Sequence, residues 1–318
     1  MKTRRKRLVI SILVLLLTLV AGVFISGAIL TAPVHKSIGD PPAELNAKSV
    51  QFQSQSGTTV YGWFIPGKKG AGAIVLMHGV RSNRLSMLDR ARFLSRAGFS
   101  VLLFDFQAHG ESSGEHITFG YLESRDAQAA VEFLRTNAQG ERIGVIGESM
   151  GGAATLLASP PLEVDAMTLE MVYPTIKQAV SNRISRRLGG WAGVLTPLMT
   201  WQLEPRLGIG VDDLRPIDKV GAIRVPKLFI VGAEDRHTTL EESEQIFAAA
   251  AEPKELWIVE GAGHTDLHAQ KKEEYEQRVL SFFKSRLSQV VFTAECKPRA
   301  TSYETLSTAG YNRFSRIL

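Results

Sequence analysis

One stretch of the chain decides the fold: Ile143-Gly144-Val145-Ile146-Gly147-Glu148-Ser149-Met150-Gly151. Its first four residues are typical of a strand buried on both faces of a parallel sheet, and a helix with 153–158 as its core is expected to follow. The five residues from Gly147 to Gly151 match G-x-S-x-G, a sharp turn that strains the serine backbone and requires glycine two residues before and after it. The sequence therefore predicts that the Ser149 hydroxyl is exposed above a sheet. It would lie at a helix N-terminus, which stabilises a developing negative charge.

Strand and helix patterns alternate on both sides of this turn. Short apolar runs predict buried strands at 73–77, 101–104, 166–169, 228–231 and 256–259, after a leading antiparallel pair at 50–53 and 60–65. Helical spacing predicts helices at 87–97, 122–134, 240–250 and 275–287. Such alternation predicts an α/β fold with a mostly parallel central sheet and helices on both faces. Ligands of such sheets bind beyond the carboxyl ends of the strands.

In this context, the Gly147–Gly151 pattern resembles the nucleophile elbow of serine hydrolases of the α/β-hydrolase superfamily. The resemblance covers residues 48–288. It implies a catalytic triad in the chain order serine, acid, histidine. His264, just past the strand that ends at Val259, lies where the family places its histidine. Asp235 completes a G-x-x-D pattern after the strand 228–231 and lies where the family places its acid.

Other residues are weaker candidates for the base and the acid. Of the three histidines that follow Ser149, His268 is expected in solvent on the next helix, and His237 is too close in sequence to the acid. Glu234 is the runner-up acid, but only Asp235 matches the motif. The remaining acid candidates lie in a long insertion and carry little weight: Asp212, Asp213 and Asp218.

Two backbone N–H groups are expected to stabilise the oxyanion of the reaction. The resemblance implies Met150, which follows the nucleophile, and Val80, in the His78-Gly79-Val80 loop after an early strand. His78 is expected to brace this loop. The loop from Asp105 to Ser112 is similar to another family pattern but carries Ala108 where glycine is usual, which predicts a slightly altered backbone there.

The N-terminus carries a basic cluster followed by an uncharged apolar run, Leu8 to Leu30. As a helix these residues span roughly 34 Å at ~1.5 Å per residue, enough to cross a bilayer core of about 30 Å. We expect an uncleaved single-pass anchor that leaves the N-terminus in the cytoplasm and the body outside it. A cleavable signal peptide, with small residues at Ser26 to Ala28, is the alternative and would give a secreted protein.

The rest of the chain falls into three further segments. Residues 31–47 are expected to form a linker, and residues 289–318 a polar tail that includes the single cysteine, Cys296. The long gap between two predicted strands indicates a helical cap at about 172–225, with helices at 175–188 and 192–203. Five of the 37 basic residues precede the apolar run, and the other 32 equal the 32 acidic residues, so nucleic-acid binding is not expected.

These features together predict a membrane-anchored serine hydrolase that cleaves carboxylic esters or related acyl compounds, small or lipid-like. No metal-ligand set and no phosphate-binding glycine motif is found, so cofactor-free chemistry is expected. The same triad could also cleave peptides or thioesters, because fold and triad do not determine the leaving group. A non-catalytic binding module on the same fold is the alternative from another class.

Overall fold

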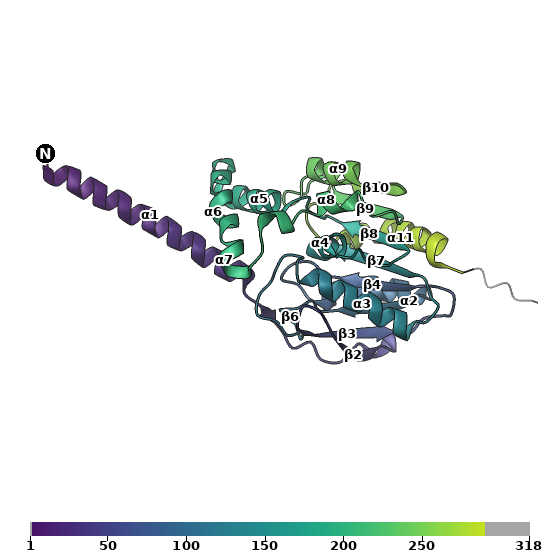
Figure 1. The fold of residues 1–318 in the computed structure, drawn as a ribbon. Coiled ribbons are helices and arrows are strands. Elements are labelled where there is room, and N and C mark those ends of the chain that lie inside the picture. Colours follow the sequence, from purple (N-terminus) through teal and green to yellow (C-terminus); the bar gives the residue numbers. More distant parts are fainter. Residues whose placement is uncertain (1, 290–318) are drawn as a thin grey trace, which may run out of the picture.

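The computed structural model describes residues 2–289 and centres on an eight-stranded sheet of order β10-β9-β8-β7-β4-β5-β3-β2 (Figure 1). The strands are β2 (Lys48–Gln53), β3 (Thr59–Ile65), β4 (Ala73–Met77), β5 (Ser100–Phe104), β7 (Ile143–Glu148), β8 (Ala166–Glu170), β9 (Lys227–Gly232) and β10 (Lys254–Val259). Six neighbouring strands are parallel to one another: β10, β9, β8, β7, β4 and β5. Strand β3 is antiparallel to both β2 and β5. The mostly parallel α/β fold predicted from the sequence is thereby confirmed.

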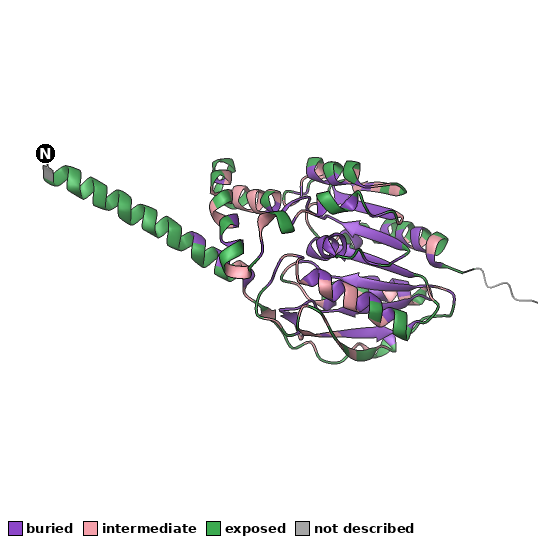
Figure 2. Cartoon of the chain, viewed as in Figure 1, coloured by how far each residue is buried: buried purple, intermediate pink, exposed green. Residues whose placement is uncertain are grey.

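Helices cover both faces of the sheet, as the apolar pattern of its strands requires. One face packs on α3 (Glu123–Asn137), α4 (Met150–Leu157), α8 (Pro216–Val220) and α9 (Leu240–Ala249), and the other on α2 (Leu88–Arg96) and α11 (Lys272–Leu287). In β4, Val75 contributes to the first core and Leu76 to the second, because successive side chains of a strand point to opposite faces. The central strands β4, β5, β7, β8 and β9 are accordingly buried along almost their whole length, whereas the edge strand β2 is largely exposed (Figure 2).

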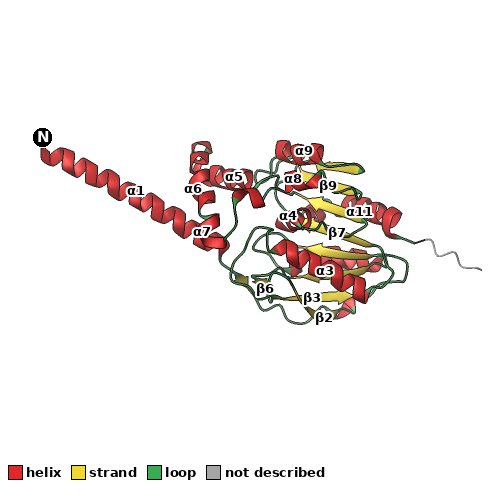
Figure 3. Ribbon diagram, in the orientation of Figure 1, coloured by secondary structure: helices red, strands yellow, loops and turns green. Residues whose placement is uncertain are grey.

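The segment between β8 and β9, residues 171–226, is called the insertion. It contains α5 (Ile176–Leu188), η3 (Gly190–Leu195), α6 (Thr196–Trp201), α7 (Leu203–Leu207), η4 (Val211–Asp213) and α8. Its helices α6 and α7 lie beside the N-terminal helix, whereas α8 packs against the body next to α9 (Figure 3). The single helix predicted over 192–203 is wrong: the chain forms a 3₁₀ segment, α6 and the start of α7 there. Gly190 and Gly193 weaken a regular helix at its start, and Pro197 is accommodated because it lies in the first turn of α6.

The N-terminal helix α1 (Lys2–Thr31) projects from the body and is exposed along most of its length (Figures 1 and 2). It is the one helix among residues 2–289 that is long and apolar enough to cross a membrane, a test that a signal sequence also passes. Its last turns are attached to the insertion. The Gln202 side-chain amide donates to the Val23 carbonyl at 3.1 Å, and Arg206 donates to the Phe24 carbonyl at 3.0 Å.

Residues 31–47, expected as a linker, are hydrogen-bonded to the body. The short strand β1 (Val34–His35) pairs in parallel with β6 (His109–Gly110). The Ile117 N–H donates to the Thr31 carbonyl at 2.9 Å, and the Glu111 carboxylate accepts from the Ile38 and Gly39 N–H groups. The end of α1 is therefore held beside the loops that follow β4 and β5. The predicted tail lies outside the described residues, apart from Gln289.

Candidate active site

Ser149 lies in the sharp turn between β7 and α4. Its φ of 49° and ψ of −109° are an unusual conformation for a residue with a side chain and one that costs backbone strain. The two flanking glycines permit the turn, because a Cβ on Gly147 would lie 2.7 Å from Gly152 Cα and one on Gly151 would lie 2.4 Å from the Met77 carbonyl oxygen. The glycine requirement inferred from the sequence therefore has a direct steric cause.

The structure brings the serine, acid and histidine candidates together at the carboxyl ends of three strands. His264 Nε2 lies 3.2 Å from Ser149 Oγ, and His264 Nδ1 lies 2.6 Å from Asp235 Oδ2. The other Asp235 oxygen accepts from the backbone N–H groups of His237 and Thr238, at 2.7 and 3.0 Å. With the carboxylate buried and acting as acceptor, Nδ1 carries the proton and Nε2 presents its lone pair to the serine hydroxyl.

The rejected acid candidates lie elsewhere. Glu234 is exposed, because adjacent loop residues point in different directions, whereas Asp235 is only 5% exposed. Asp212 and Asp213 lie on the exposed side of η4, and the Asp218 carboxylate pairs with Arg215. None of these carboxylates forms a hydrogen bond with His264 in the part of the chain that the structure describes.

The two remaining histidines have environments that the sequence did not predict. The His237 ring stacks on the His264 ring with centroids 5.0 Å apart, and desolvation together with the charge of Arg183 lowers the His237 pKa to about 4, so its ring is neutral at pH 7. The expectation that His268 is solvated is wrong: its ring is buried, stacks on Phe93 and contacts Glu276. The Asp266 side chain caps the helix α10 (Leu267–Gln270) and turns His268 inward.

The two expected oxyanion donors border the same cavity as Ser149. Met150 is the first residue of α4, so its N–H has no acceptor within the helix. The Ser149 N–H is already used, since it donates to the Glu170 carbonyl at 2.8 Å. Val80 follows β4, and within residues 2–289 its N–H makes no hydrogen bond to the protein. Within residues 2–289, the Val80 and Met150 N–H groups are therefore both without a protein acceptor at the cavity that Ser149 lines.

Two buried histidines brace the loops that follow β4 and β5. His78 accepts from the Phe106 N–H through Nε2 and donates to the Gly79 carbonyl through Nδ1, and burial lowers its pKa to about 3. His109 accepts from the Arg81 N–H at 3.0 Å in the same way. Ala108, the departure from the glycine pattern, has a φ of +59°, which is the conformation for which glycine is favoured.

The alpha/beta hydrolase family model matches residues 74–278, which include the Ser149 turn and the loops of Asp235 and His264. The chain belongs to this family. The uncharacterized protein YqkD of Bacillus subtilis is 27% identical over 236 residues, 72% of this chain and 76% of that protein. The alpha/beta hydrolase domain-containing protein WAV2 of Arabidopsis thaliana is 28% identical over 239 residues, 69% of this chain and 72% of that protein.

Solved esterases share the architecture of this hydrolase. The Pyrococcus furiosus esterase Pf2001 superposes with a TM-score of 0.65 and 26% identity, over 80% of this chain and 99% of that chain. Together with the family match, this likeness supports hydrolase activity for the chain.

Two ion-pair networks lie under the site of the hydrolase. Arg84 is buried and pairs with Asp105 at 2.5 Å and with Glu111. Arg90 is buried between α2 and the sheet, where it pairs with Glu170 at 2.7 Å and with Asp266 at 3.0 Å. The Tyr275 hydroxyl also binds Glu170. These networks hold the strand ends and loops that carry Ser149 and His264, and no sequence motif indicated them.

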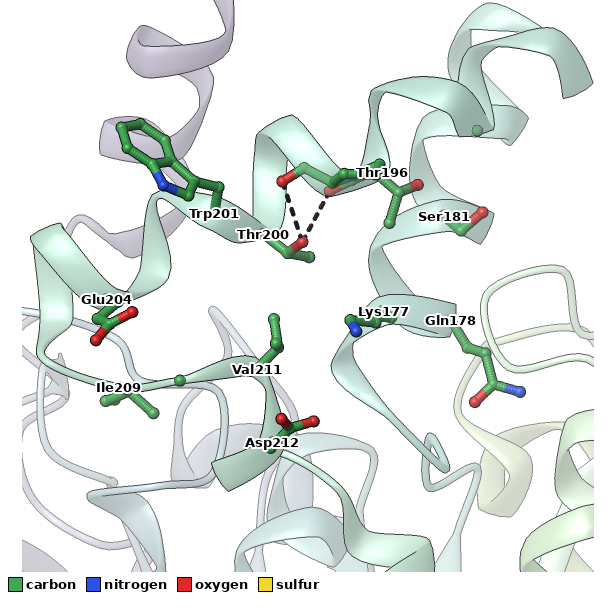
Figure 4. Close-up of a pocket in the computed structure, with 13 residues that line it drawn as sticks. Lys177, Gln178, Ser181, Thr196, Thr200, Trp201, Glu204, Ile209, Val211 and Asp212 are labelled. Atoms are coloured by element: carbon green, nitrogen blue, oxygen red, sulfur yellow. Dashed lines mark hydrogen bonds between the residues drawn. The ribbon is translucent and has the colours of Figure 1, made fainter.

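Two separate hollows open in the hydrolase. A cavity of about 220 Å³ contains Ser149 and is covered by α5. A larger hollow of about 800 Å³ lies within the insertion, between α5 and the α6–α7 pair, with Lys177, Thr200 and Val211 among its lining (Figure 4). The two share no lining residue, so the larger hollow is not part of the Ser149 site. Among residues 2–289, no group of three or more His, Cys, Asp or Glu side chains could hold a metal ion.

Proposed function

We propose that this protein is a serine hydrolase that cleaves carboxylic esters or related acyl compounds through a Ser149-Asp235-His264 triad. The observation that carries the proposal is the continuous hydrogen-bond path from Asp235 through His264 to Ser149, with distances of 2.6 and 3.2 Å. A serine hydroxyl is a weak nucleophile unless an oriented base accepts its proton, and this arrangement supplies that base.

In the proposed mechanism, Ser149 Oγ attacks the acyl carbon while His264 Nε2 takes the hydroxyl proton. Asp235 stabilises the resulting imidazolium without itself accepting the proton. The imidazolium then protonates the leaving alcohol, which departs and leaves an acyl group on Ser149. Water, activated by His264, attacks this acyl-enzyme, releases the acid and restores the serine.

The negative charge of each tetrahedral intermediate is proposed to lie between the Val80 and Met150 N–H groups. Donors of this type are each worth about 10²–10³ in kcat, because they are already oriented when the charge develops. The N-terminus of α4 points at the same oxygen and adds a favourable partial charge. The strained turn at Ser149 supports this proposal, since it places the nucleophile directly before Met150, the first residue of α4.

For localisation, we propose that α1 is retained as a single-pass anchor with its basic end in the cytoplasm and the catalytic body on the other side. The proposal is supported by the length of α1 and by the bonds from Gln202 and Arg206 to its last turns. Extraction of membranes with alkaline carbonate should leave the full-length protein in the pellet. A mature protein that begins near residue 29 would identify a cleaved signal peptide instead.

The direct test of the function uses the full chain, purified in detergent, and a fluorophosphonate probe. Wild-type protein should be labelled, whereas Ser149→Ala and His264→Ala should not. A p-nitrophenyl ester series and a set of short peptides and acyl thioesters would then identify the preferred acyl compound. Absence of labelling in a folded protein, with and without lipid, would contradict the proposal. Labelling with turnover of peptides but not esters would identify a peptidase.

A further inference from the structure

The cavity over Ser149 has an uneven distribution of charge. Its walls are mostly apolar, with Val80, Phe119 and Ile176 among them. The charged residues that line it are all basic: Arg81 from the loop after β4, and Arg183, Arg186 and Arg187 from α5. No carboxylate lines the cavity. A substrate that enters this space therefore meets a strongly positive wall next to the reacting serine.

None of these four arginines has an acidic partner among the residues that the structure describes. The fully buried Arg84 and Arg90 are each paired with carboxylates, but within residues 2–289 no carboxylate lies within 4 Å of Arg81, Arg183, Arg186 or Arg187. Arg183 donates to the Ala179 carbonyl at 3.1 Å, and Arg81 donates to the Ile29 carbonyl at 2.9 Å. Arg186 donates to His237 Nε2.

Of the four arginines, Arg183 occupies the position where a bound anion would be most favourable. It is half-buried in the cavity wall, and desolvation lowers its pKa. Asp235 and Glu242 are near enough to attract it, but neither lies within ion-pair distance of Arg183, and the Asp235 oxygens already accept from His264 and from the His237 and Thr238 N–H groups. A guanidinium left partly desolvated without a counter-ion is unfavourable, and an anion bound beside it would relieve that cost.

The dipole of helix α5 explains the position of only two of the four cavity arginines. Arg186 and Arg187 lie in the last turn of α5, where the helix dipole favours cations. Arg183 lies one turn earlier and Arg81 belongs to another loop, so the dipole does not explain their presence at the same cavity. Four arginines from two separate elements therefore line one cavity.

We infer that the cavity binds an acyl substrate carrying a carboxylate or phosphate, with the anion held by Arg183 and its neighbours while Ser149 attacks the acyl carbon. This inference rests on the proposed function and names its substrate class. The cavity volume of about 220 Å³ is below the roughly 300–1,000 Å³ of common ligand pockets, so the part of the substrate enclosed there is small.

The anion could belong to a soluble compound or to a lipid headgroup. Leu30, at the end of α1, also lines the cavity, so its mouth lies at the end of the membrane-spanning candidate. The chemistry that recognises the ligand is the same in both cases. Two assays separate the two sources.

The soluble assay compares the mono-p-nitrophenyl ester of glutaric acid, which is anionic, with neutral p-nitrophenyl valerate. Wild-type full chain should prefer the anionic ester in kcat/KM. In Arg183→Gln and Arg187→Gln the ratio of the two values should fall by about tenfold, the effect of losing one charge-assisted hydrogen bond. Lys177→Gln is the matched control, since it removes a charge from the same helix but lines the other hollow, and its ratio should match wild type.

The lipid assay measures fatty acid released from phosphatidylglycerol or phosphatidylcholine vesicles. A preference for phosphatidylglycerol that Arg183→Gln removes supports the inference with a headgroup as the source, and a preference seen only with the soluble ester supports it with a small anionic substrate. Equal ratios in wild type and both arginine variants in both assays, while the fluorophosphonate probe labels Ser149, overturn this inference alone. Failure of wild type to react with the probe is the separate result that overturns the proposed function.

Discussion

The floor and the roof of the Ser149 cavity differ in whether their arginines are paired with carboxylates. In the floor, formed by the strand ends and the loops that follow them, Arg84 and Arg90 are fully buried and each is paired with two carboxylates. In the roof, formed by α5, Arg183, Arg186 and Arg187 have no carboxylate within 4 Å among residues 2–289. Both regions contain arginines, but the buried Arg84 and Arg90 are neutralised by the protein itself, whereas the α5 arginines are not neutralised by any of residues 2–289.

This difference separates charges that hold the fold from charges directed at a ligand. A buried charge without a partner costs several kcal/mol, so the floor can contain Arg90 only because Glu170 and Asp266 accompany it. Arginines that reach solvent through a cavity mouth cost much less and remain available to an anion. We expect substitutions in the floor to change stability or chemistry, and substitutions in the roof to change substrate preference.

The largest effect is expected at the chemical centre of the floor. Ser149→Ala should lower kcat/KM for an ester by about 10⁴-fold or more, since it removes the nucleophile and leaves only the oxyanion donors. The melting temperature should stay the same or rise, because the substitution removes a nearly buried hydroxyl whose contact with His264 is a long one of 3.2 Å. Steady-state hydrolysis and thermal unfolding of the same preparation check both parts. Residual activity within tenfold of wild type would refute the assignment of Ser149.

The next effect concerns the buried ion pairs of the floor. Arg90→Met should reduce the free energy of unfolding by about 3–5 kcal/mol, because Glu170 would be left buried without its counter-ion. Chemical denaturation followed by circular dichroism measures the change. Arg187→Met, in the roof, is the matched control and should stay within about 0.5 kcal/mol of wild type. Equal losses in the two variants would remove the distinction between floor and roof.

The floor residue Glu148 should make the stability of the protein depend on pH. Burial raises its pKa to about 7; Arg90 opposes this rise, and Glu170 and Asp266 reinforce it. The folded state thus holds this proton more tightly than the unfolded chain, so its contribution to stability is complete below pH 4.5 and is lost as pH rises through 7. Relative to wild type, Glu148→Gln should gain about 3 kcal/mol between pH 4.5 and pH 8. Unfolding curves at the two pH values test this, and a constant difference would contradict it.

The smallest effect is expected for His237, which lies between roof and floor. His237→Phe keeps a ring against His264 but removes the acceptor for Arg186. We expect kcat/KM for a neutral ester to fall by about threefold to tenfold, corresponding to one modest hydrogen bond. His237→Ala, which also removes the stacking, should lose more. A loss as large as that of His264→Ala would mean that His237 takes part in proton transfer.

Much of the floor could be predicted from the sequence because its signals are local. The apolar runs marked the strands to within two or three residues, and the G-x-S-x-G pattern located the turn at Ser149. His268 was misplaced because its burial depends on Phe93 and Glu276, from two other helices. The single helix predicted over 192–203 does not form, because Gly190, Gly193 and Pro197 favour a 3₁₀ segment followed by a new helix. The spacing of apolar residues, on which the prediction rested, does not show this effect.

The roof could not be predicted in the same way. The sequence showed that α5 is basic, but the direction of its arginines depends on how the insertion folds over the sheet. The choice between Asp235 and Glu234 rested on a family motif, and their opposite orientations in the loop appear only once β9 and β10 lie side by side.

The sequence by itself determined the α/β alternation, the serine turn and the apolar N-terminal helix, because steric limits on a turn and the period of apolar residues act within a few neighbours along the chain. Only the tertiary structure decided that His264 reaches both Ser149 and Asp235, that residues 31–47 bind the body, and that four arginines without a carboxylate partner among residues 2–289 line the cavity of Ser149. Those contacts join residues that are far apart in sequence, and their distances depend on the packing of the whole sheet.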